Sequence, residues 1–177
     1  MKLLILDRDG VINHDSDAYI KSPDEWRPIE GSPEAIARFT NAGWRVMVAT
    51  NQSGIGRGLF DLETLASIHA KMHATVQAAG GQIDAVFFCP HPDSAQCECR
   101  KPRPGMILEI LSRTGAAPTD VIMVGDSLRD MEAGQAAGVR TVLVLTGNGQ
   151  RTLQNNELPN GTQVRVSLAA LAQELLP

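Results

Sequence analysis

Five short apolar segments recur along the chain, and helical patterns separate them. They are mostly aliphatic and rich in branched side chains, which is typical of strands covered on both faces. The segments lie at 2–6, 44–49, 83–88, 121–124 and 141–145. Strands that alternate with helices predict βαβ units, which build a parallel sheet with right-handed crossovers. We therefore predict an α/β protein whose parallel sheet carries helices on both faces.

The ends of the predicted helices are marked by capping residues, proline and glycine. Ser32 is expected to cap a helix that begins at Pro33 and stops before Gly43. Asp61 is expected to cap a helix over 62–79. Further helices are predicted over 104–114, 128–137 and 167–176, with a polar loop over 147–166.

Composition and charge are those of an ordinary globular protein. With 177 residues, 43% of them hydrophobic, the chain is predicted to form a single domain over 1–177. Its formal net charge is −4, so it lacks the basic surface of a nucleic-acid binder. The apolar runs are shorter than the roughly 18 residues of a membrane helix. We therefore predict a cytoplasmic monomer that binds neither nucleic acid nor membrane.

Polar residues follow four of the predicted strands near the point where each one ends. Ligands of open α/β sheets bind beyond the carboxyl ends of the strands, so we expect these residues to converge. They are Asp7 and Asp9, Thr50 and Asn51, Arg100 and Lys101, and Asp126 with Asp130. Four carboxylates in one cleft repel each other unless a cation is present, and hard oxygen ligands favour Mg²⁺.

The other residue types in this set suit a phosphate group. Lys101, Arg100 and the Thr50 hydroxyl offer positive charge and hydrogen-bond donors to phosphate oxygens. An aspartate can attack phosphorus and form an aspartyl-phosphate. A second carboxyl two residues later can protonate the leaving group and then activate water. The motifs therefore predict phosphoryl transfer at Asp7, assisted by Asp9.

In these motifs the chain resembles the haloacid dehalogenase superfamily of phosphohydrolases over nearly its whole length. The resemblance implies a Rossmann-like fold in which Asp7 is the nucleophile and Asp9 the general acid and base. Thr50 matches the second motif of that superfamily and Lys101 the third. No large insertion separates Asp9 from Thr50, so the chain resembles a capless member with an open site.

The resemblance also implies how magnesium is held. The expected ligands are Asp7, the backbone carbonyl of Asp9, and Asp126 of the fourth motif. Asp130, from the same motif, is expected to support a metal-bound water or to orient the site.

A second cluster of metal-binding residue types follows the third predicted strand. Cys89, His91, Cys97 and Cys99 form the pattern C-x-H-x5-C-x-C, which uses every cysteine of the chain. Three thiolates and one imidazole complete a tetrahedral zinc site and leave no open position, so the zinc should be structural. The alternative is a set of idle thiols.

This loop makes the chain similar to the zinc-bearing subgroup of the superfamily. That subgroup includes phosphatases of heptose bisphosphates and of histidinol phosphate. The stretch TNQSGIGRG, at 50–58, is similar to the heptose enzymes. The resemblance implies that Asn51, Arg57 and Arg100 contact the sugar phosphate. The expected reaction is hydrolysis of heptose 1,7-bisphosphate at the 7-phosphate, with Mg²⁺ as catalytic and Zn²⁺ as structural cofactor.

Two alternative functions remain open at this point. The first is hydrolysis of histidinol phosphate, for which Asp15, Asp17 or Glu25 could face the substrate ammonium group. The second is a non-catalytic phosphoacceptor module similar to a receiver domain, which would form a stable aspartyl-phosphate without turnover. His69 and His73 are four residues apart on one predicted helix, and we interpret them as solvent-facing rather than as metal ligands.

Overall fold

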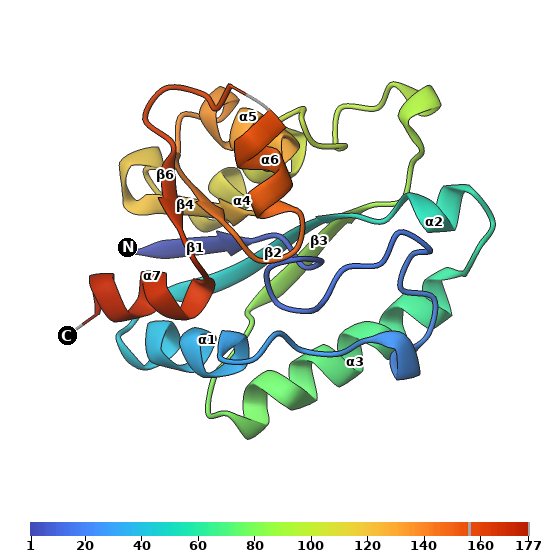
Figure 1. The fold of residues 1–177 in the computed structure, drawn as a ribbon, viewed down its shortest axis with the longest axis horizontal. Helices are drawn as coiled ribbons and strands as arrows, with labels where there is room; N and C mark the ends of the chain where they lie inside the picture. Colours follow the sequence, from blue (N-terminus) through green and yellow to red (C-terminus); the bar gives the residue numbers. More distant parts are fainter. Residues whose placement is uncertain (156, 177) are drawn as a thin grey trace.

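Six parallel strands form one sheet within residues 1–155 and 157–176, the part of the chain that the computed structural model describes (Figure 1). The order across the sheet is β3–β2–β1–β4–β5–β6. In chain order these strands are β1 (Leu3–Leu6), β2 (Arg45–Asn51), β3 (Ala85–Cys89), β4 (Val121–Gly125), β5 (Arg140–Val144) and β6 (Gln163–Arg165).

Helices cover both faces of the sheet (Figure 1). One face carries α1 (Ser32–Asn41), α3 (Leu62–Ala78) and α7 (Leu168–Leu175), and the other carries α4 (Gly105–Thr114) and α5 (Leu128–Ala136). The shorter elements are α2 (Ser53–Gly56), α6 (Gly149–Asn155) and the 3-10 turns η1 (Pro23–Glu25), η2 (Asp93–Ala95) and η3 (Pro118–Asp120). In the described residues, no helix is both long and apolar enough to cross a bilayer.

The central strand β1 shows why both faces need covering. Its four residues are completely buried. Side chains of a strand alternate between faces, so Leu4 and Leu6 pack in the layer of α1, α3 and α7. Leu3 and Ile5 pack in the layer of α4 and α5. This division continues beyond the strand end, where it decides which polar side chains face the cleft.

The predicted strands and most predicted helices are confirmed, but two local predictions are wrong. The segment 147–166 contains α6 and the edge strand β6 rather than a loop throughout. Gln163–Arg165 is a three-residue edge strand that is exposed or half-buried, so it lacks the apolar run that predicts the other strands. Ser32 does not cap α1, because its hydroxyl donates to the backbone oxygen of Val11 at 2.8 Å. Gly31, with a φ of 81°, takes the capping position.

Candidate active site

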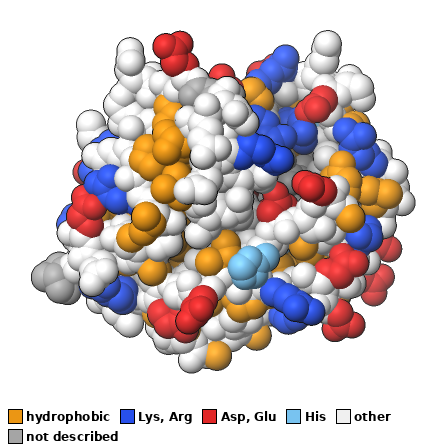
Figure 2. All heavy atoms as spheres, viewed as in Figure 1, with side chains coloured by type: hydrophobic (Ala, Val, Ile, Leu, Met, Phe, Trp, Pro, Cys, Tyr) orange, Lys and Arg blue, Asp and Glu red, His pale blue; other side chains and the backbone are white. Residues whose placement is uncertain are grey.

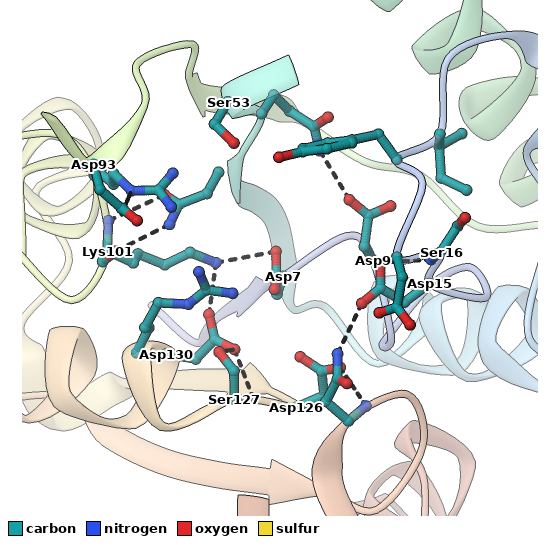
Figure 3. Close-up of a pocket in the computed structure, with 18 of the residues that line it drawn as sticks. Asp7, Asp9, Asp15, Ser16, Ser53, Asp93, Lys101, Asp126, Ser127 and Asp130 are labelled. Carbon is teal, nitrogen blue, oxygen red and sulfur yellow. Dashed lines mark hydrogen bonds and ion pairs between the residues drawn. The ribbon is translucent and has the colours of Figure 1, made fainter. Parts of the chain in front are cut away.

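The carboxyl ends of β1, β2 and β4 open into one polar cavity of about 320 Å³ (Figure 3). The strands run parallel and in register, with Leu6 paired to both Val48 and Val124, so they end at the same edge of the sheet. The predicted site residues that line the cavity are Asp7, Asp9, Asn51, Arg57, Arg100, Lys101, Asp126 and Asp130. The sheet therefore brings together segments that are far apart in the sequence.

Lys101 is the buried cation of this cavity. Its side chain is 2% exposed, and its Nζ lies 3.0 Å from Asp7 Oδ1 and 2.6 Å from Asp130 Oδ1. Nζ also donates to the Ala49 backbone oxygen at 2.7 Å. Burial opposes the charge of Lys101, but the two carboxylates outweigh it and raise the lysine pKa. Lys101 is thus held charged beside the carboxyl that we predict to be the nucleophile.

Three carboxyl groups lie close together in the cavity, and their oxygens are all within 4.8 Å of one another. They belong to Asp7, Asp126 and Asp130. Burial raises the pKa of Asp7 to about 7, and the charge of Asp130 adds to the effect. Burial likewise raises the pKa of Asp126 to about 8, with Asp130 and Asp7 contributing. One lysine does not neutralise this group, so its electrostatics favour binding of a divalent cation.

Asp130 is placed behind the other two aspartates rather than open to the cavity centre. It is fully buried, and its Oδ2 accepts hydrogen bonds from the Ser127 backbone at 3.0 Å and hydroxyl at 2.7 Å. The bond from the Ser127 backbone belongs to a capping box at the start of α5. Its other oxygen holds Lys101. This placement suits the orienting role predicted from the sequence.

Two glycines allow the backbone to pass close to Asp126. Gly10 has a φ of +82° and Gly147 a φ of +56°, and a Cβ atom at either position would collide with Asp126 Oδ2. The backbone nitrogen of Asn148, next to Gly147, donates to that same oxygen at 2.7 Å. The loops after β1 and β5 therefore close tightly around this carboxyl.

Asp9 is surrounded by positive charge and hydrogen-bond donors, unlike Asp7, although only one residue separates the two aspartates. Burial opposes its charge, but the Arg8 guanidinium and the hydrogen bonds of Asn13 and Gln52 outweigh burial and lower the Asp9 pKa. Asn13 Nδ2 donates to Asp9 Oδ1 and Gln52 Nε2 to Asp9 Oδ2, both at 2.9 Å. Figure 3 shows Asp7 beside Lys101 and Asp9 on the side of Asp7 away from that lysine. Two carboxyls with such different surroundings are suited to different tasks.

Thr50 and Asn51, at the end of β2, support their neighbours. Thr50 is 1% exposed, and its hydroxyl accepts a hydrogen bond from Gln52 Nε2 at 2.9 Å. Asn51 donates from Nδ2 to the Lys101 backbone oxygen and accepts from the Lys101 backbone nitrogen, both at 3.0 Å. Asn51 therefore holds the peptide on which Lys101 is carried. Direct contact of Thr50 and Asn51 with a substrate stays a prediction.

Basic side chains gather along one rim of a hollow in the surface, and acidic side chains lie within and opposite it (Figure 2). Arg57, Arg100 and Arg129 line the cavity together with Lys101. Arg100 is held by Asp93 and donates to the His91 backbone oxygen at 3.3 Å. The loop that contains His91 therefore sets the position of this arginine.

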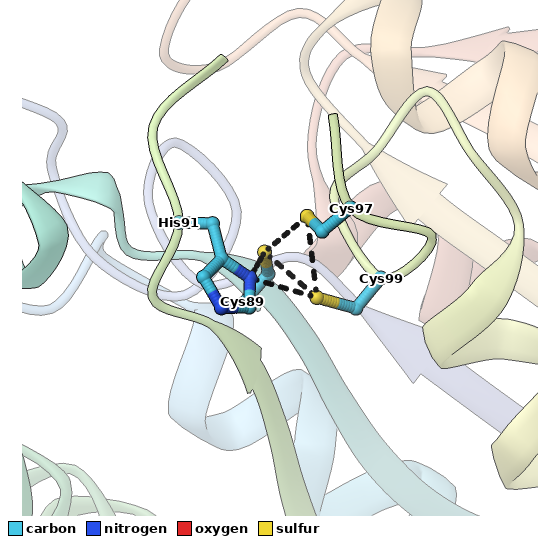
Figure 4. Close-up of side chains that lie close together, drawn as sticks. All are labelled: Cys89, His91, Cys97 and Cys99. Carbon is cyan, nitrogen blue, oxygen red and sulfur yellow. Dashed lines mark hydrogen bonds between the residues drawn. The ribbon is translucent and has the colours of Figure 1, made fainter. Parts of the chain in front are cut away.

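The four predicted zinc ligands come together at the end of β3 (Figure 4). The sulfur of Cys89 lies 3.5 Å from Cys97 Sγ and 3.0 Å from Cys99 Sγ, and His91 Nδ1 lies 3.5 Å from Cys89 Sγ. These sulfur separations are well beyond a disulfide bond of about 2.05 Å. Ligands on zinc bonds of about 2.0–2.3 Å would stand about 3.3–3.8 Å apart at the corners of a tetrahedron. The cluster is therefore close to the arrangement that a zinc ion requires.

Several residues of the site were missed by the sequence analysis. Asn148 follows β5, a strand end that was not searched because 147–166 was taken as a plain loop. Its Nδ2 donates to Asp15 Oδ2 at 2.8 Å and so joins the Asp126 loop to the opposite wall of the cavity. Gln52 is adjacent to a recognised motif, yet its bond to Asp9 has no signal in the sequence. The interpretation of His69 as solvent-facing is wrong, because it is only 9% exposed and contacts Arg8.

Comparison with known proteins agrees with this geometry. The HAD-hydrolase-like family model matches residues 98–171. The D-glycero-β-D-manno-heptose-1,7-bisphosphate 7-phosphatase of Bordetella bronchiseptica is 55% identical over 176 residues, which cover 99% of this chain and 98% of the relative. The protein of the same name from Neisseria meningitidis serogroup A is 53% identical over 178 residues, covering 99% and 95%. The chain belongs to this heptose-bisphosphate phosphatase family.

A solved structure from this family shares the whole fold. The B. bronchiseptica D,D-heptose 1,7-bisphosphate phosphatase, crystallised with magnesium and phosphate, superposes with a TM-score of 0.97 at 55% identity, covering 99% of this chain and 98% of that one. Membership in the heptose-bisphosphate phosphatase family confirms the resemblance to the haloacid dehalogenase superfamily. It also confirms the predicted fold class, a parallel α/β sheet of the capless type with a Cys/His loop.

Proposed function

We propose that this protein is a magnesium-dependent phosphatase that removes the 7-phosphate of D-glycero-D-manno-heptose 1,7-bisphosphate. The observation that carries the proposal is the contact of Lys101 with Asp7 inside a three-aspartate cluster, in a chain 55% identical to a phosphatase of that substrate. We treat residues 1–177 as one phosphohydrolase domain, because all six described strands belong to the sheet that carries the site.

Asp7 is the proposed nucleophile. Its Oδ attacks phosphorus in line with the ester oxygen, and the phosphorus–oxygen ester bond breaks as an aspartyl-phosphate forms. Asp9 acts here in its protonated form, which the negative charge of a bound phosphate favours against the effect of Arg8, and it donates that proton to the departing sugar oxygen. Asp9 then takes a proton from water, which attacks the aspartyl-phosphate and releases inorganic phosphate and free Asp7. Lys101 and the Thr50 hydroxyl stabilise the charge on the phosphoryl oxygens.

The carboxyl cluster fits magnesium. Asp7, Asp126 and the backbone carbonyl of Asp9 are the proposed ligands, and Asp130 orients the group from behind through Lys101 and Ser127. The fit rests on the three carboxylates whose oxygens lie within 4.8 Å of one another, and burial together with their mutual repulsion raises the pKa of Asp7 and Asp126. When bound, the ion supplies charge neutralisation to the phosphoryl oxygens.

The Cys/His cluster fits a structural zinc ion. Cys89, His91, Cys97 and Cys99 provide four ligands and thus leave no position for a substrate. The role that we propose is mechanical. The loop they close carries Asp93 and the His91 backbone oxygen, and both hold Arg100.

A bisphosphate suits the charge distribution of the cavity better than a monophosphate does. One phosphate is expected beside Asp7 and Lys101, while Arg57 and Arg100 are proposed to bind the sugar phosphate further out. The opposite wall carries Asp15 and Asp17, which can accept hydrogen bonds from sugar hydroxyls. The relatives named for heptose bisphosphate support this substrate over histidinol phosphate, and their phosphatase activity supports an enzyme over a receiver-like module.

A substrate panel tests the proposal. We expect kcat/KM for heptose 1,7-bisphosphate with Mg²⁺ to exceed that for histidinol phosphate by at least roughly 100-fold, since the latter lacks a second phosphate. Phosphate release is expected to stop on addition of EDTA and to return with excess Mg²⁺. A higher kcat/KM for histidinol phosphate would overturn the assigned substrate. A stable aspartyl-phosphate with no turnover would overturn the enzyme assignment.

A further inference from the structure

Arg8 lies between the two aspartates of the first motif but faces away from the cleft. Leu4 and Leu6 of β1 pack in the layer that contains α3, and Arg8 continues this alternation. Its side chain is completely buried. The guanidinium therefore occupies the space between the cleft and helix α3.

The guanidinium of Arg8 donates hydrogen bonds to the Asp9 carboxylate from two nitrogens. Its Nε donates to Asp9 Oδ1 at 3.0 Å, and its Nη2 donates to Oδ1 at 2.9 Å and to Oδ2 at 3.1 Å. A guanidinium is planar and its donors have a fixed fork geometry, so these bonds restrict the plane of the carboxylate as well as its distance. The Asp9 side chain is still 22% exposed, so it remains accessible from the cavity.

His69 of α3 lies behind the guanidinium. Its Nε2 is 3.2 Å from Arg8 Nη1, the nitrogen that Asp9 does not use. Burial and the charge of Arg8 lower the pKa of His69 to about 3, so the imidazole is neutral and can accept from Arg8. Among the described residues, the side-chain partners of the Arg8 guanidinium are Asp9 and His69. A buried arginine with so few partners depends on each of them for its position.

We propose that Arg8, held from behind by His69, is a positioning residue that aims the Asp9 carboxyl at the leaving-group oxygen of the substrate. This inference rests on the proposed function, in which Asp9 is the acid and base. Asn13 and Gln52 hold one Asp9 oxygen each from the sides. Arg8 is the one described residue that contacts both oxygens. Loss of its support should rotate the carboxyl while leaving Asp7 and Lys101 in place.

The test compares two leaving groups. A sugar alkoxide needs a proton to depart, whereas the nitrophenolate of 4-nitrophenyl phosphate departs without one. In rapid-mixing experiments we expect His69→Phe to slow phosphoenzyme formation from heptose bisphosphate about tenfold or more, because a misaimed acid transfers its proton poorly. The rate of the nitrophenolate burst should change by less than about threefold, and KM for heptose bisphosphate should be nearly unchanged. His69→Gln, whose amide oxygen can accept from Arg8, should restore most of the sugar rate.

Two controls keep the outcome decisive. His73 lies one turn further along α3 and makes no hydrogen bond to Arg8 or Asp9 among the described residues, so His73→Gln should leave both rates unchanged. If His69→Phe does not fold, His69→Ala is measured with the same two substrates. If the variant slows both substrates equally, or slows neither of them, the positioning role is wrong. Asp9→Asn is measured alongside, and if this variant also fails to discriminate between the leaving groups, the acid role of Asp9 on which the inference rests is wrong, whereas the substrate panel decides the proposed function.

Discussion

The carboxyl cluster and the Cys/His cluster are assembled in opposite ways. Asp7 and Asp126 come from distant parts of the chain and meet because β1 and β4 are hydrogen-bonded neighbours. The four Cys/His side chains all come from 89–99, and His91 is exposed. The first cluster is presented by the buried sheet whether or not a metal binds. In the second, Cys89 is a fully buried core residue, but Cys97 and Cys99 are only partly buried and His91 is exposed, so the position of the loop should depend on its metal.

This difference predicts that the two clusters can be disabled separately. Damage to the carboxyl cluster should abolish chemistry without loosening the fold, because the sheet beneath it is independently packed. Damage to the Cys/His cluster should loosen a loop and weaken substrate binding, because Arg100 is held by that loop.

The largest effect is expected from Asp7→Asn. The amide cannot act as the nucleophile, so kcat should fall by roughly 10⁴-fold or more. The melting temperature should not fall, because the substitution removes one charge from a crowded group. Zinc content, measured by atomic absorption, should stay the same as in the unaltered protein. Near-normal kcat in the folded variant would exclude the covalent route, and loss of zinc would show that the clusters are coupled.

A smaller and different effect is expected from Cys97→Ser. Removal of one ligand should reduce bound zinc and raise KM for the bisphosphate about 10- to 100-fold, because Asp93 and His91 no longer hold Arg100. The Mg²⁺ concentration for half-maximal rate should be unchanged, since the carboxyl cluster is untouched. Steady-state kinetics at several Mg²⁺ concentrations separates these effects. A kcat loss as large as that of Asp7→Asn would contradict the division between the clusters.

The third expected effect acts on stability rather than on catalysis, and it is a pH dependence in the metal-free protein. Burial raises the folded-state pKa of Asp7 to about 7 and of Asp126 to about 8, above the unfolded value of 3.8. Between the unfolded and folded pKa values of each carboxyl, the folded state binds more protons than the unfolded state. The free energy of unfolding should therefore fall as pH rises. From pH 6 to pH 8 we expect the free energy of unfolding to fall by about 3–4 kcal/mol, measured by urea unfolding in EDTA, if the two carboxyls titrate independently.

The control for this pH dependence is the variant Asp126→Asn. The variant lacks the titrating carboxyl of Asp126, and Asp7 no longer has that charge beside it. The stability of the variant should therefore change less between pH 6 and pH 8. Added Mg²⁺ should stabilise the unaltered protein more at pH 8 than at pH 6, because the ion replaces protons on these carboxyls. Identical pH slopes in the two proteins would show that the carboxyl cluster is not the cause.

The strands and the local motifs were predictable because their signals are local. A strand covered on both faces needs an apolar run, and β1, β2, β4 and β5, like the edge strand β3, have one. The edge strand β6 is only three residues long and partly exposed, so it lacks an apolar run and was missed, as was Asn148 in the same predicted loop. The Cys/His cluster was predictable from its residue types, since every cysteine of the chain and one histidine lie within one loop.

The sequence by itself determined the parallel α/β architecture, the order of the four motifs and the residue types available for phosphate and metal. Only the tertiary structure decided that Asp7 and Asp9, two residues apart, have oppositely shifted pKa values. The reason is that a pKa depends on charges and burial in space. Asp7 faces Asp130 and Lys101, whereas Asp9 is held by Arg8, and behind Arg8 lies a histidine from a helix sixty residues later. No local pattern in the chain encodes that contact.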